Sequence, residues 1–369
     1  MPDILQIDGG YHEGGGQIVR TALALSTILK KPFVVDNIRK ARINPGLKQQ
    51  HIYCVKALEE LCGAISRGVE ICSTRMEYEP KKILRKNLDI DIGTAGSVGL
   101  LMQAILLPCL FAGKKMRIKL HGGTDTKWAM PFDYFREVFL PQLRRYCISI
   151  EARLLRRGYY PKGNGIIEVI ITPKYSLEEF GSPEEFLSKL ISESPMINII
   201  EQGHLLHIKG VSHASLDLQS AKVAERQARE AKRCLSRFNC PINIREEYSE
   251  ASSTGTGITL WAIFSKEVDE INYLCPIILG ADSLGEKGKR AEAVGKDAAE
   301  KLGREILSNA PVDSHLADSL IPFIGLFGGQ IKVSMITPHT ETSIYVAERF
   351  LGKLFNINSE SSIISVVSI

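Results

Sequence analysis

The chain has 369 residues, 44% of them hydrophobic and 24% charged, and a formal net charge of +4 at pH 7. A sequence of this length and apolar content can bury two domains, or one large domain with an insertion, which excludes a largely disordered chain. The mild positive charge is compatible with a phosphate-bearing partner and identifies none.

The sequence contains no uninterrupted apolar run of about 18 residues, the length that a membrane-spanning helix requires. Residues 1–6 lack the basic and apolar regions of a secretory signal. The 8 cysteines form no CxxC pair, so neither a zinc site nor a dense disulfide framework is indicated. We therefore expect a cytoplasmic protein with reduced cysteines and no membrane partner.

One pattern occurs three times along the chain: a Gly or Asp turn, an apolar helix, a short break and an alternating strand. The helix and strand of each copy span 16–29 and 33–38, 96–111 and 116–120, and 316–327 and 331–336. A loop and a second amphipathic helix follow each copy, at 49–61, 132–146 and 342–351. Because one such unit is too small to bury its own apolar face, the pattern predicts an α/β (α+β) core of three repeated βα units, with helices packed on sheets.

A stretch of different character separates the second and third copies. It opens with an acidic, Ser-rich segment at 176–194 and contains strand patterns at 205–211 and 258–264 around a charged helix pattern at 221–238. These features predict a smaller inserted α/β domain, from which a helix at 289–307 leads back to the third unit. The predicted domains are a core with units one and two (1–182), the insertion (183–269) and a core with unit three (270–369).

The loops at strand ends and helix starts hold most of the unusual residues, and ligand-binding groups converge at such ends in α/β folds. In the Gly-rich loop 8–17, the glycines permit close approach of the backbone, and the helix that follows offers free N–H groups to an anion. Glu13 could hold a divalent cation there, and Arg20 could point toward the same anion. A flexible turn, a capping carboxylate and a solvated arginine are the alternatives.

A basic cluster follows the first strand, where Arg39 and Arg42 precede a Pro-Gly turn at 45–46. Guanidinium groups bind phosphate through paired charge-assisted hydrogen bonds, so these arginines suit a phosphate clamp, although such clusters are also common on solvated faces. Gln103 stands in an otherwise apolar helix and needs a polar partner, either substrate or a backbone carbonyl. Segment 156–165 combines basic, aromatic and Gly residues, which suits a nucleic-acid backbone with a stacked base, or an ordinary surface turn.

His339 lies in a Pro- and Thr-rich loop at 337–342, with no Cys or second His beside it as a metal partner. A neutral imidazole in such a loop suits a nucleophile or a general base, and a structural histidine is the alternative. Upstream, Asp313 or Ser314 could cap the helix of the third unit.

Six motifs, taken in order, resemble those of the RNA 3′-terminal phosphate cyclase family. They are Glu-Gly-Gly-Gly-Gln from 13, Ile-Arg-x-x-Arg-x-x-Pro-Gly-Leu from 38, Thr-Ala-Gly-Ser from 94, Gly-Gly-Thr-Asp from 122, Tyr-Pro-Lys-Gly from 160 and Leu-Ala-Asp from 316. The resemblance covers residues 8–175 and 280–351 and is weak in the insertion. It implies a core of three repeated βα units related in fold to the enolpyruvyl transferases, with a smaller inserted domain.

The resemblance also implies an activity, the ATP-dependent conversion of an RNA 3′-terminal phosphate to a 2′,3′-cyclic phosphodiester with release of AMP and pyrophosphate. His339 would be the catalytic nucleophile that carries AMP covalently and passes it to the RNA phosphate. Glu13 is expected to bind Mg2+ or Mn2+ against the ATP phosphates. Pro131 and His315 are expected to sandwich adenine, with Asp318 nearby. The residues expected to bind phosphate oxygens are Arg20, Arg39, Arg42, Gln50 and Gln103.

Two residues depart from the family pattern. His315 stands where bacterial members carry Tyr, which bears on nucleotide preference, and Thr-Pro precedes His339 in place of Ser-Cys. Two other functions stay open: a non-catalytic RNA-binding ribosome-biogenesis relative of the same fold, and an enolpyruvyl transferase. The expected partners are ATP and an RNA with a 3′-terminal phosphate, and a homodimer is left open.

Overall fold

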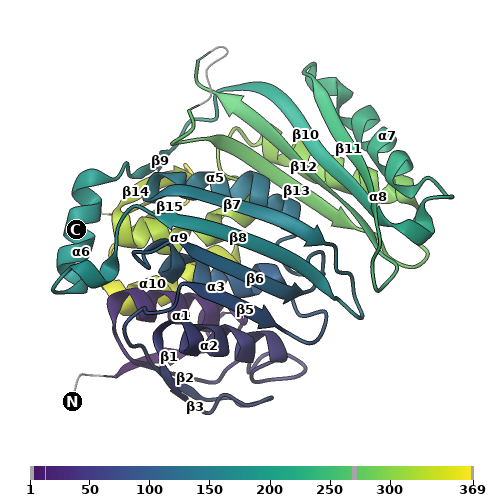
Figure 1. The fold of residues 1–369 in the computed structure, drawn as a ribbon. Helices are drawn as coiled ribbons and strands as arrows, with labels where there is room; N and C mark the ends of the chain where they lie inside the picture. Colours follow the sequence, from purple (N-terminus) through teal and green to yellow (C-terminus); the bar gives the residue numbers. More distant parts are fainter. Residues whose placement is uncertain (1–3, 13, 268–271, 367–369) are drawn as a thin grey trace.

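The first unit of the core is a βαβ crossover followed by a second helix and an antiparallel pair of strands (Figure 1). The computed structural model describes residues 4–12, 14–267 and 272–366. The elements of this unit are β1 (Leu5–Asp8), α1 (Gln17–Leu29), β2 (Phe33–Asp36), α2 (Gln49–Cys62), β3 (Ile65–Arg67) and β4 (Met76–Glu79). β1 and β2 are parallel, β3 and β4 are antiparallel, and the order in the sheet is β1-β2-β4-β3.

The second unit repeats this arrangement. Its elements are β5 (Asn87–Asp91), α3 (Val98–Leu110), β6 (Met116–Gly122), α4 (Phe132–Tyr134), a π-helical turn (Phe135–Phe139), α5 (Leu140–Leu143), β7 (Cys147–Arg156) and β8 (Gly165–Pro173). The sheet order β5-β6-β8-β7, with a parallel first pair and an antiparallel last pair, is that of the first unit. The helix expected over 132–146 is therefore one helical segment interrupted by a π turn.

The third unit has the same order of strands, but the inserted domain interrupts its crossover. Its elements are β9 (Ile197–Ile199), α9 (Ser314–Phe327), β14 (Gly329–Lys332), α10 (Pro338–Leu351), β15 (Phe355–Asn358) and β16 (Ile363–Val366). The sheet order is β9-β14-β16-β15, and β9 and β14 are parallel. The predicted α/β core of three repeated units is confirmed, and each unit has one βαβαββ topology.

The inserted domain forms its own four-stranded sheet, of order β11-β10-β12-β13, covered by two helices on one face (Figure 1). Its elements are β10 (His204–Ser215), α7 (Val223–Leu235), β11 (Ile242–Ser249), β12 (Thr256–Ser265), β13 (Ile277–Leu284) and α8 (Ala291–Leu307). β13 and α8 lie beyond the limit expected at 269. Within 183–269, by contrast, β9 pairs with β14 of the third unit, after a helix α6 (Pro183–Glu193). Pairing partners, which hydrophobic periodicity does not report, account for these differences from the expected limits.

The centre of the core holds α1 and α3, which pack against each other, and α1 also packs against α10. All 13 residues of α1 are buried, and every residue of α3 is buried except Gln103. A helix that is apolar around its circumference is stable only when other elements surround it. Arg20 on α1 and Gln103 on α3 are therefore polar groups held inside a packed core. None of the described helices is long and apolar enough to cross a membrane.

Candidate active site

A cleft of about 560 Å³ lies where the core helices meet the loop 126–131 and the inserted domain. Its walls come from α1, α3, α9 and α10 of the core, and from β13 and α8 of the insertion. Six of the residues expected at the site line this cleft: Arg20, Gln103, Pro131, His315, Asp318 and His339. The fold thus brings together residues from all three repeated units.

The side chain of Gln17, at the start of α1, fixes the orientation of the His339 imidazole. Gln17 Nε2 donates to Asp318 Oδ2 at 3.2 Å and to the His339 carbonyl at 3.1 Å. Because the amide nitrogen faces these acceptors, Gln17 Oε1 must be the atom that faces His339 Nδ1, at 2.8 Å. Only a protonated Nδ1 can complete that contact, so Nε2 of a neutral His339 keeps its lone pair. This is the tautomer that a nucleophile attacking through Nε2 requires.

His339 lies in the first turn of α10, which begins at Pro338. Thr337 caps the helix, and its Oγ1 accepts a hydrogen bond from the Thr340 N–H at 3.1 Å. The free N–H groups and the helix dipole at this end favour a negative charge. A phosphate brought to His339 would therefore also meet the positive end of a helix.

Arg20 and Gln103 are partners. The Arg20 Nε donates to Gln103 Oε1 at 3.2 Å. This hydrogen bond supplies the polar partner that the Gln103 amide needs in the apolar helix α3. Burial lowers the pKa of Arg20, and the nearby Cys54 and Asp318 oppose this shift. A guanidinium stays charged in proteins, so Arg20 brings a buried positive charge to the cleft. Burial also raises the pKa of Asp318. The nearby His339, His315 and Arg20 act in the opposite direction and limit this rise.

The other expected phosphate ligands lie outside the lining of the cleft. Arg39 is half-buried, and its Nη1 donates to the carbonyls of Asn44 and Gly46, at 2.8 and 3.1 Å. Burial lowers the pKa of Arg39, and the charge of Arg42 lowers it further, so two cations stand close together on this loop. Arg42 is exposed, and Gln50, in the first turn of α2, is half-buried. Glu13, the expected metal ligand, lies outside the described residues.

His51 is a residue of this region that the sequence did not single out. It is 1% exposed, and its Nδ1 accepts a hydrogen bond from the Lys48 N–H at 2.9 Å. Burial, followed by the charges of Arg20, Arg39 and Lys48, lowers the pKa of His51 to about 3. The imidazole is therefore neutral, with its proton on Nε2. A Cβ at Gly16 would lie 2.0 Å from that atom, so glycine is required at this helix start.

The expected adenine site is formed at the starts of two helices. Pro131 is buried and immediately precedes α4, and His315 is exposed in the first turn of α9. The rings of His315 and Tyr134 meet edge to face, with centroids 6.4 Å apart. Asp313 Oδ1 accepts hydrogen bonds from the N–H groups of His315 and Leu316, as expected for a helix cap. Tyr134 also donates to Asp313, at 2.6 Å, which ties the two helix starts together.

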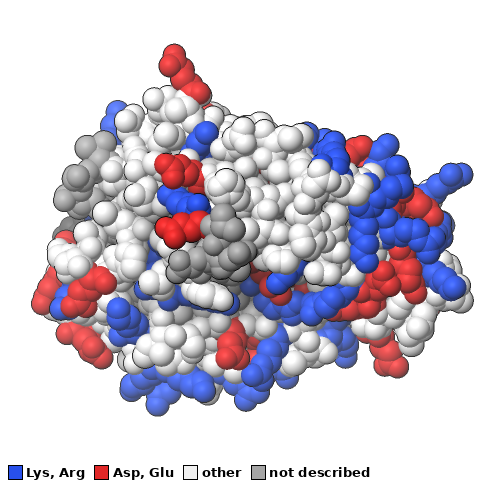
Figure 2. All heavy atoms as spheres, turned by 90° about the horizontal axis from the view of Figure 1, so that it is seen from above, with Lys and Arg blue, Asp and Glu red and all other residues white. Residues whose placement is uncertain are grey.

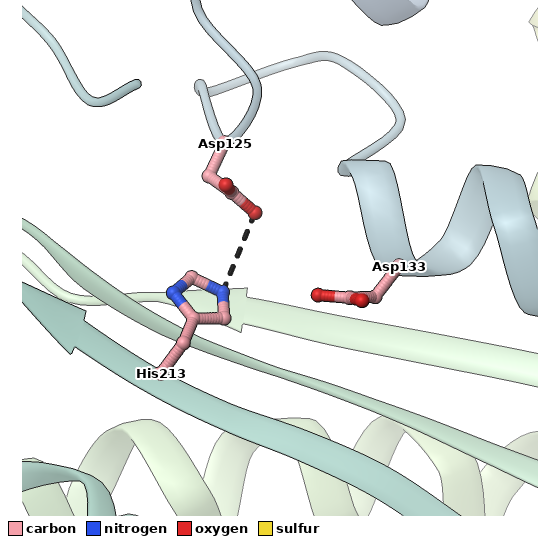
Figure 3. Close-up of side chains that lie close together, drawn as sticks. All are labelled: Asp125, Asp133 and His213. Carbon is pink, nitrogen blue, oxygen red and sulfur yellow. Dashed lines mark ion pairs between the residues drawn. The ribbon is translucent and has the colours of Figure 1, made fainter. Parts of the chain in front are cut away.

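A buried network of charges joins the second unit to the inserted domain. Figure 3 shows Asp125 and Asp133, from the second unit, directed toward His213 on β10. His213 Nε2 lies 3.3 Å from Asp125 Oδ1, and His213 Nδ1 contacts the Tyr159 hydroxyl at 2.8 Å. Arg157 is 2% exposed and bonds both carboxylates, Asp125 at 3.2 Å and Asp133 at 2.7 Å. The charge of His213, followed by that of Arg157, lowers the pKa of Asp125 against the effect of its burial.

The ligand atoms of Asp125, Asp133 and His213 lie within 4.8 Å of one another, a spacing that metal sites also show. Here the Arg157 guanidinium already supplies the positive charge between the two carboxylates, so the group does not fit a cation site. The segment 156–165 was expected to suit a nucleic-acid backbone. Arg157 and Tyr159 are instead buried in this network, because their partners lie in the interior: the carboxylates of Asp125 and Asp133 for Arg157, and the imidazole of His213 for Tyr159.

The charged surface of the inserted domain is mixed in sign. Figure 2 shows Lys and Arg side chains interspersed with Asp and Glu at its right end, over the part of the molecule that carries α7 in Figure 1. Arg226 pairs with Glu292 at 2.7 Å, and Arg233 pairs with Glu230 at 2.6 Å. These arginines are neutralised by their neighbours, so the face is that of a solvated helix rather than a track for a polyanion.

Comparison with known proteins points to the same family that the sequence motifs resemble. A family model described as RNA 3′-terminal phosphate cyclase matches residues 11–357. The chain is 39% identical over 357 residues to the RNA 3′-terminal phosphate cyclase of Pyrococcus abyssi, covering 97% of this chain and 96% of the relative. It is 41% identical over 358 residues to that of Thermococcus onnurineus, with 97% and 96% covered. It is 41% identical over 359 residues to that of Saccharolobus solfataricus, with 97% of each chain covered.

Proposed function

Because the chain belongs to the RNA 3′-terminal phosphate cyclase family, we propose that it acts through three successive transfers at phosphorus. In the first, His339 Nε2 attacks the α-phosphate of ATP, and pyrophosphate leaves. In the second, an oxygen of the RNA 3′-phosphate attacks the same phosphorus and displaces His339. In the third, the terminal ribose 2′-oxygen attacks the RNA 3′-phosphate, a 2′,3′-cyclic phosphodiester forms, and AMP leaves.

The contact between Gln17 and His339 carries this proposal. It assigns the proton to Nδ1 and leaves Nε2 as the nucleophilic atom. An imidazole is also a good leaving group, because its P–N adduct is reactive toward a second acceptor. The same nitrogen therefore suits both formation and breakdown of the covalent intermediate.

The surroundings of His339 support transfer at phosphorus. Such reactions need alignment and neutralisation of charge more than covalent help from the protein. Arg20 brings a buried cation to the same cleft, held in place by Gln103. We propose that Arg20 and Gln103 bind phosphate oxygens of ATP, and that Arg39, Arg42 and Gln50 bind phosphate from the neighbouring loop. Pro131 and His315 would stack on the two faces of the adenine, and Asp318 would lie nearby.

ATP is the co-substrate in this proposal, and Glu13 would hold Mg2+ or Mn2+ against its phosphates. A bound divalent ion would supply further neutralisation of the phosphate charge. Glu13 itself lies outside the described residues. A cytoplasmic location and a homodimer stay predictions.

Labelling with ATP tests the covalent step. We expect α-labelled ATP, with Mg2+ or Mn2+, to give a protein adduct that is labile in acid and stable in alkali, as a P–N bond is. His339→Ala should abolish the adduct. His204→Ala, which removes an exposed histidine on β10 of the inserted domain, is the matched control and should label normally. Labelling that survives in His339→Ala would assign the nucleophile to another residue.

A change in the RNA tests the last step separately. An RNA whose terminal nucleotide carries a 3′-phosphate but no 2′-hydroxyl lacks the final attacking group. We expect this RNA to accept AMP and to accumulate as the adenylate, while the ordinary RNA yields the cyclic phosphate. The non-catalytic alternative predicts neither product. An enolpyruvyl transferase would form no labelled protein.

A further inference from the structure

The rim of the cleft carries an aromatic ring that the proposed reaction leaves without a role. Trp128 lines the cleft together with Pro131, His315 and His339, and it is 94% exposed. The other tryptophan of the chain, Trp261, is 5% exposed and belongs to the hydrophobic core. A large aromatic side chain left almost wholly in water at the mouth of a binding cleft is a candidate contact surface.

The backbone at Trp128 has an unusual conformation. Trp128 has φ of 60°, in the left-handed region that bulky residues rarely occupy. The loop runs from exposed Lys127 and Trp128 to buried Pro131, and all three residues line the cleft. Lys127 Nζ also pairs with Glu286 of the inserted domain at 3.0 Å, which ties the rim to the opposite wall.

Electrostatic attraction alone does not favour a nucleic acid at this end of the cleft. Lysines and carboxylates face it in equal number: Lys127, Lys289 and Lys301, with Asp282, Glu286 and Asp297. Two of these lysines are paired within the protein, Lys127 with Glu286 and Lys289 with Asp297, the latter at 2.6 Å. An RNA end held here would therefore depend on its base rather than on its backbone charge.

We propose that Trp128 is a stacking platform for the base of the RNA's 3′-terminal nucleotide. This rests on the proposed function, in which the RNA 3′-phosphate must reach AMP on His339 from solvent. Pro131 of the expected adenine site is buried, whereas Trp128 in the same cleft lining is almost fully exposed and is therefore accessible to an incoming RNA. A base stacks on an aromatic ring whatever its identity, which suits an enzyme that accepts varied RNA ends.

Stacking of one base on an aromatic ring contributes enough affinity to change binding roughly 5- to 150-fold. We expect Trp128→Ala to raise the KM for a 3′-phosphate RNA by a factor in this range, and to leave the KM for ATP and the rate of protein labelling unchanged. Trp128→Phe should restore most of the loss. Tyr273→Ala, which removes a side chain that is 68% exposed outside the cleft lining, is the control and should change neither KM.

The RNA itself supplies a second arm. An RNA with an abasic 3′-terminal nucleotide should bind the wild-type protein as weakly as an ordinary RNA binds Trp128→Ala, and the variant should not distinguish the two RNAs. An unchanged RNA KM in Trp128→Ala would overturn the proposal. So would a raised KM for ATP with an unchanged RNA KM, since Trp128 would then belong to the nucleotide.

Fluorescence separates this inference from the proposed reaction. With ATP left out, binding of a 3′-phosphate RNA should quench the exposed Trp128 and leave the buried Trp261 unaffected, so the quenching should vanish in Trp128→Phe. If the protein forms no adenylate but the quenching remains, the platform stands and the proposed chemistry fails. If adenylate forms and no quenching is seen, the platform fails and the chemistry stands.

Discussion

The Oε1 atom of Gln17 lies 2.8 Å from Nδ1 of His339, although the two residues are 322 positions apart in the chain. The contact joins the start of α1 in the first unit to the start of α10 in the third. It joins the first helix of one unit to the second helix of another, and both helix starts line one cleft. A side chain of one unit thereby orients the imidazole of another and favours the tautomer with its proton on Nδ1.

Removing the Gln17 amide should slow formation of the adenylate more than it weakens ATP binding. In Gln17→Ala, His339 loses the acceptor that holds both its orientation and its tautomer. The imidazole becomes cationic as Nε2 bonds to phosphorus, and a hydrogen bond made by a charged group is worth about 1.5–3 kcal/mol. We therefore expect the labelling rate at saturating ATP to fall roughly 10- to 150-fold. Rapid-quench labelling, together with the Kd of ATP, measures the two effects apart.

Ser343→Ala is the matched control for this variant. Ser343 also accepts a hydrogen bond from Gln17 Nε2, but the Asp318 and His339 carbonyl contacts would still orient the amide. Its labelling rate should stay within a few-fold of wild type. Equal losses in the two variants would show that the loss reflects general packing rather than the tautomer of His339.

His315→Tyr should strengthen ATP binding. A phenol ring offers a larger stacking face than imidazole, and aromatic pairs contribute about 0.5–1.5 kcal/mol beyond area burial. The Kd of ATP should therefore fall roughly 2- to 10-fold, and in His315→Ala it should rise. Isothermal titration with ATP and GTP provides the measurement. An unchanged Kd in both variants would remove His315 from the adenine site.

Hydrophobic periodicity was sufficient to predict the three repeated units, because helices such as α1 and α3 are apolar and are bounded by clear turns. It missed short or edge strands, including β1 and β9, whose few residues carry no period of their own. It also did not reveal that the insertion interrupts the crossover of the third unit. Only the pairing of β9 with β14, across more than 100 intervening residues, shows this.

Six expected site residues do line one cleft. The signal for Arg20 and His339 was their position near helix starts and strand ends, and for Gln103 it was a polar side chain in an apolar helix. The other three, Pro131, His315 and Asp318, were indicated only by the family resemblance. Gln17 and His51 were missed because their importance lies in distant partners. In the sequence, Gln17 was noted only as the last residue of a Gly-rich motif, with no role of its own. The buried role of Arg157 was also hidden, since the carboxylates that need it are 24 and 32 positions away.

The free energy of unfolding should fall in acid because of His51. Its pKa is about 3 in the folded protein and about 6.5 in an unfolded chain. Between these values the unfolded state binds more protons, so stability is lost as the pH falls from 6.5 toward 3. The slope due to this group is at most about 1.4 kcal/mol per pH unit. His51→Gln should lack this contribution, and urea unfolding at several pH values measures it.

Asp313 contributes with the opposite sign. Burial raises its pKa to about 6, so between about 3.8 and 6 the folded state binds more protons, and this part of the stability is lost as the pH rises. Asp313 is present in both proteins, and its contribution cancels in the difference between wild type and His51→Gln. Parallel pH curves for the two proteins between pH 6.5 and 5 would contradict the prediction.

Arg157→Met should destabilise the protein strongly, because it removes the buried cation that Asp125 and Asp133 share and leaves Asp133 with Arg136 alone. Breaking a buried pair from one side costs about 3–5 kcal/mol. Arg153→Met is the matched control: Arg153 pairs with Glu151 on the same strand, β7, but both side chains are 61% exposed. Such surface pairs contribute about 0–1 kcal/mol, so this variant should unfold almost as wild type does. Urea unfolding of the three proteins at neutral pH measures the difference.

The loss in Arg157→Met should shrink as the pH falls. Without the guanidinium, the effect of burial, which raises the pKa of Asp125, would be opposed less, so acid would neutralise this carboxylate more readily in the folded state. The same reasoning predicts that adding Asp125→Asn and Asp133→Asn to Arg157→Met recovers part of the stability at neutral pH, since amides carry no buried charge. A loss that is independent of pH and is not recovered by the asparagines would mean that Arg157 acts through the packing of its side chain. The network would then not hold the inserted domain by charge.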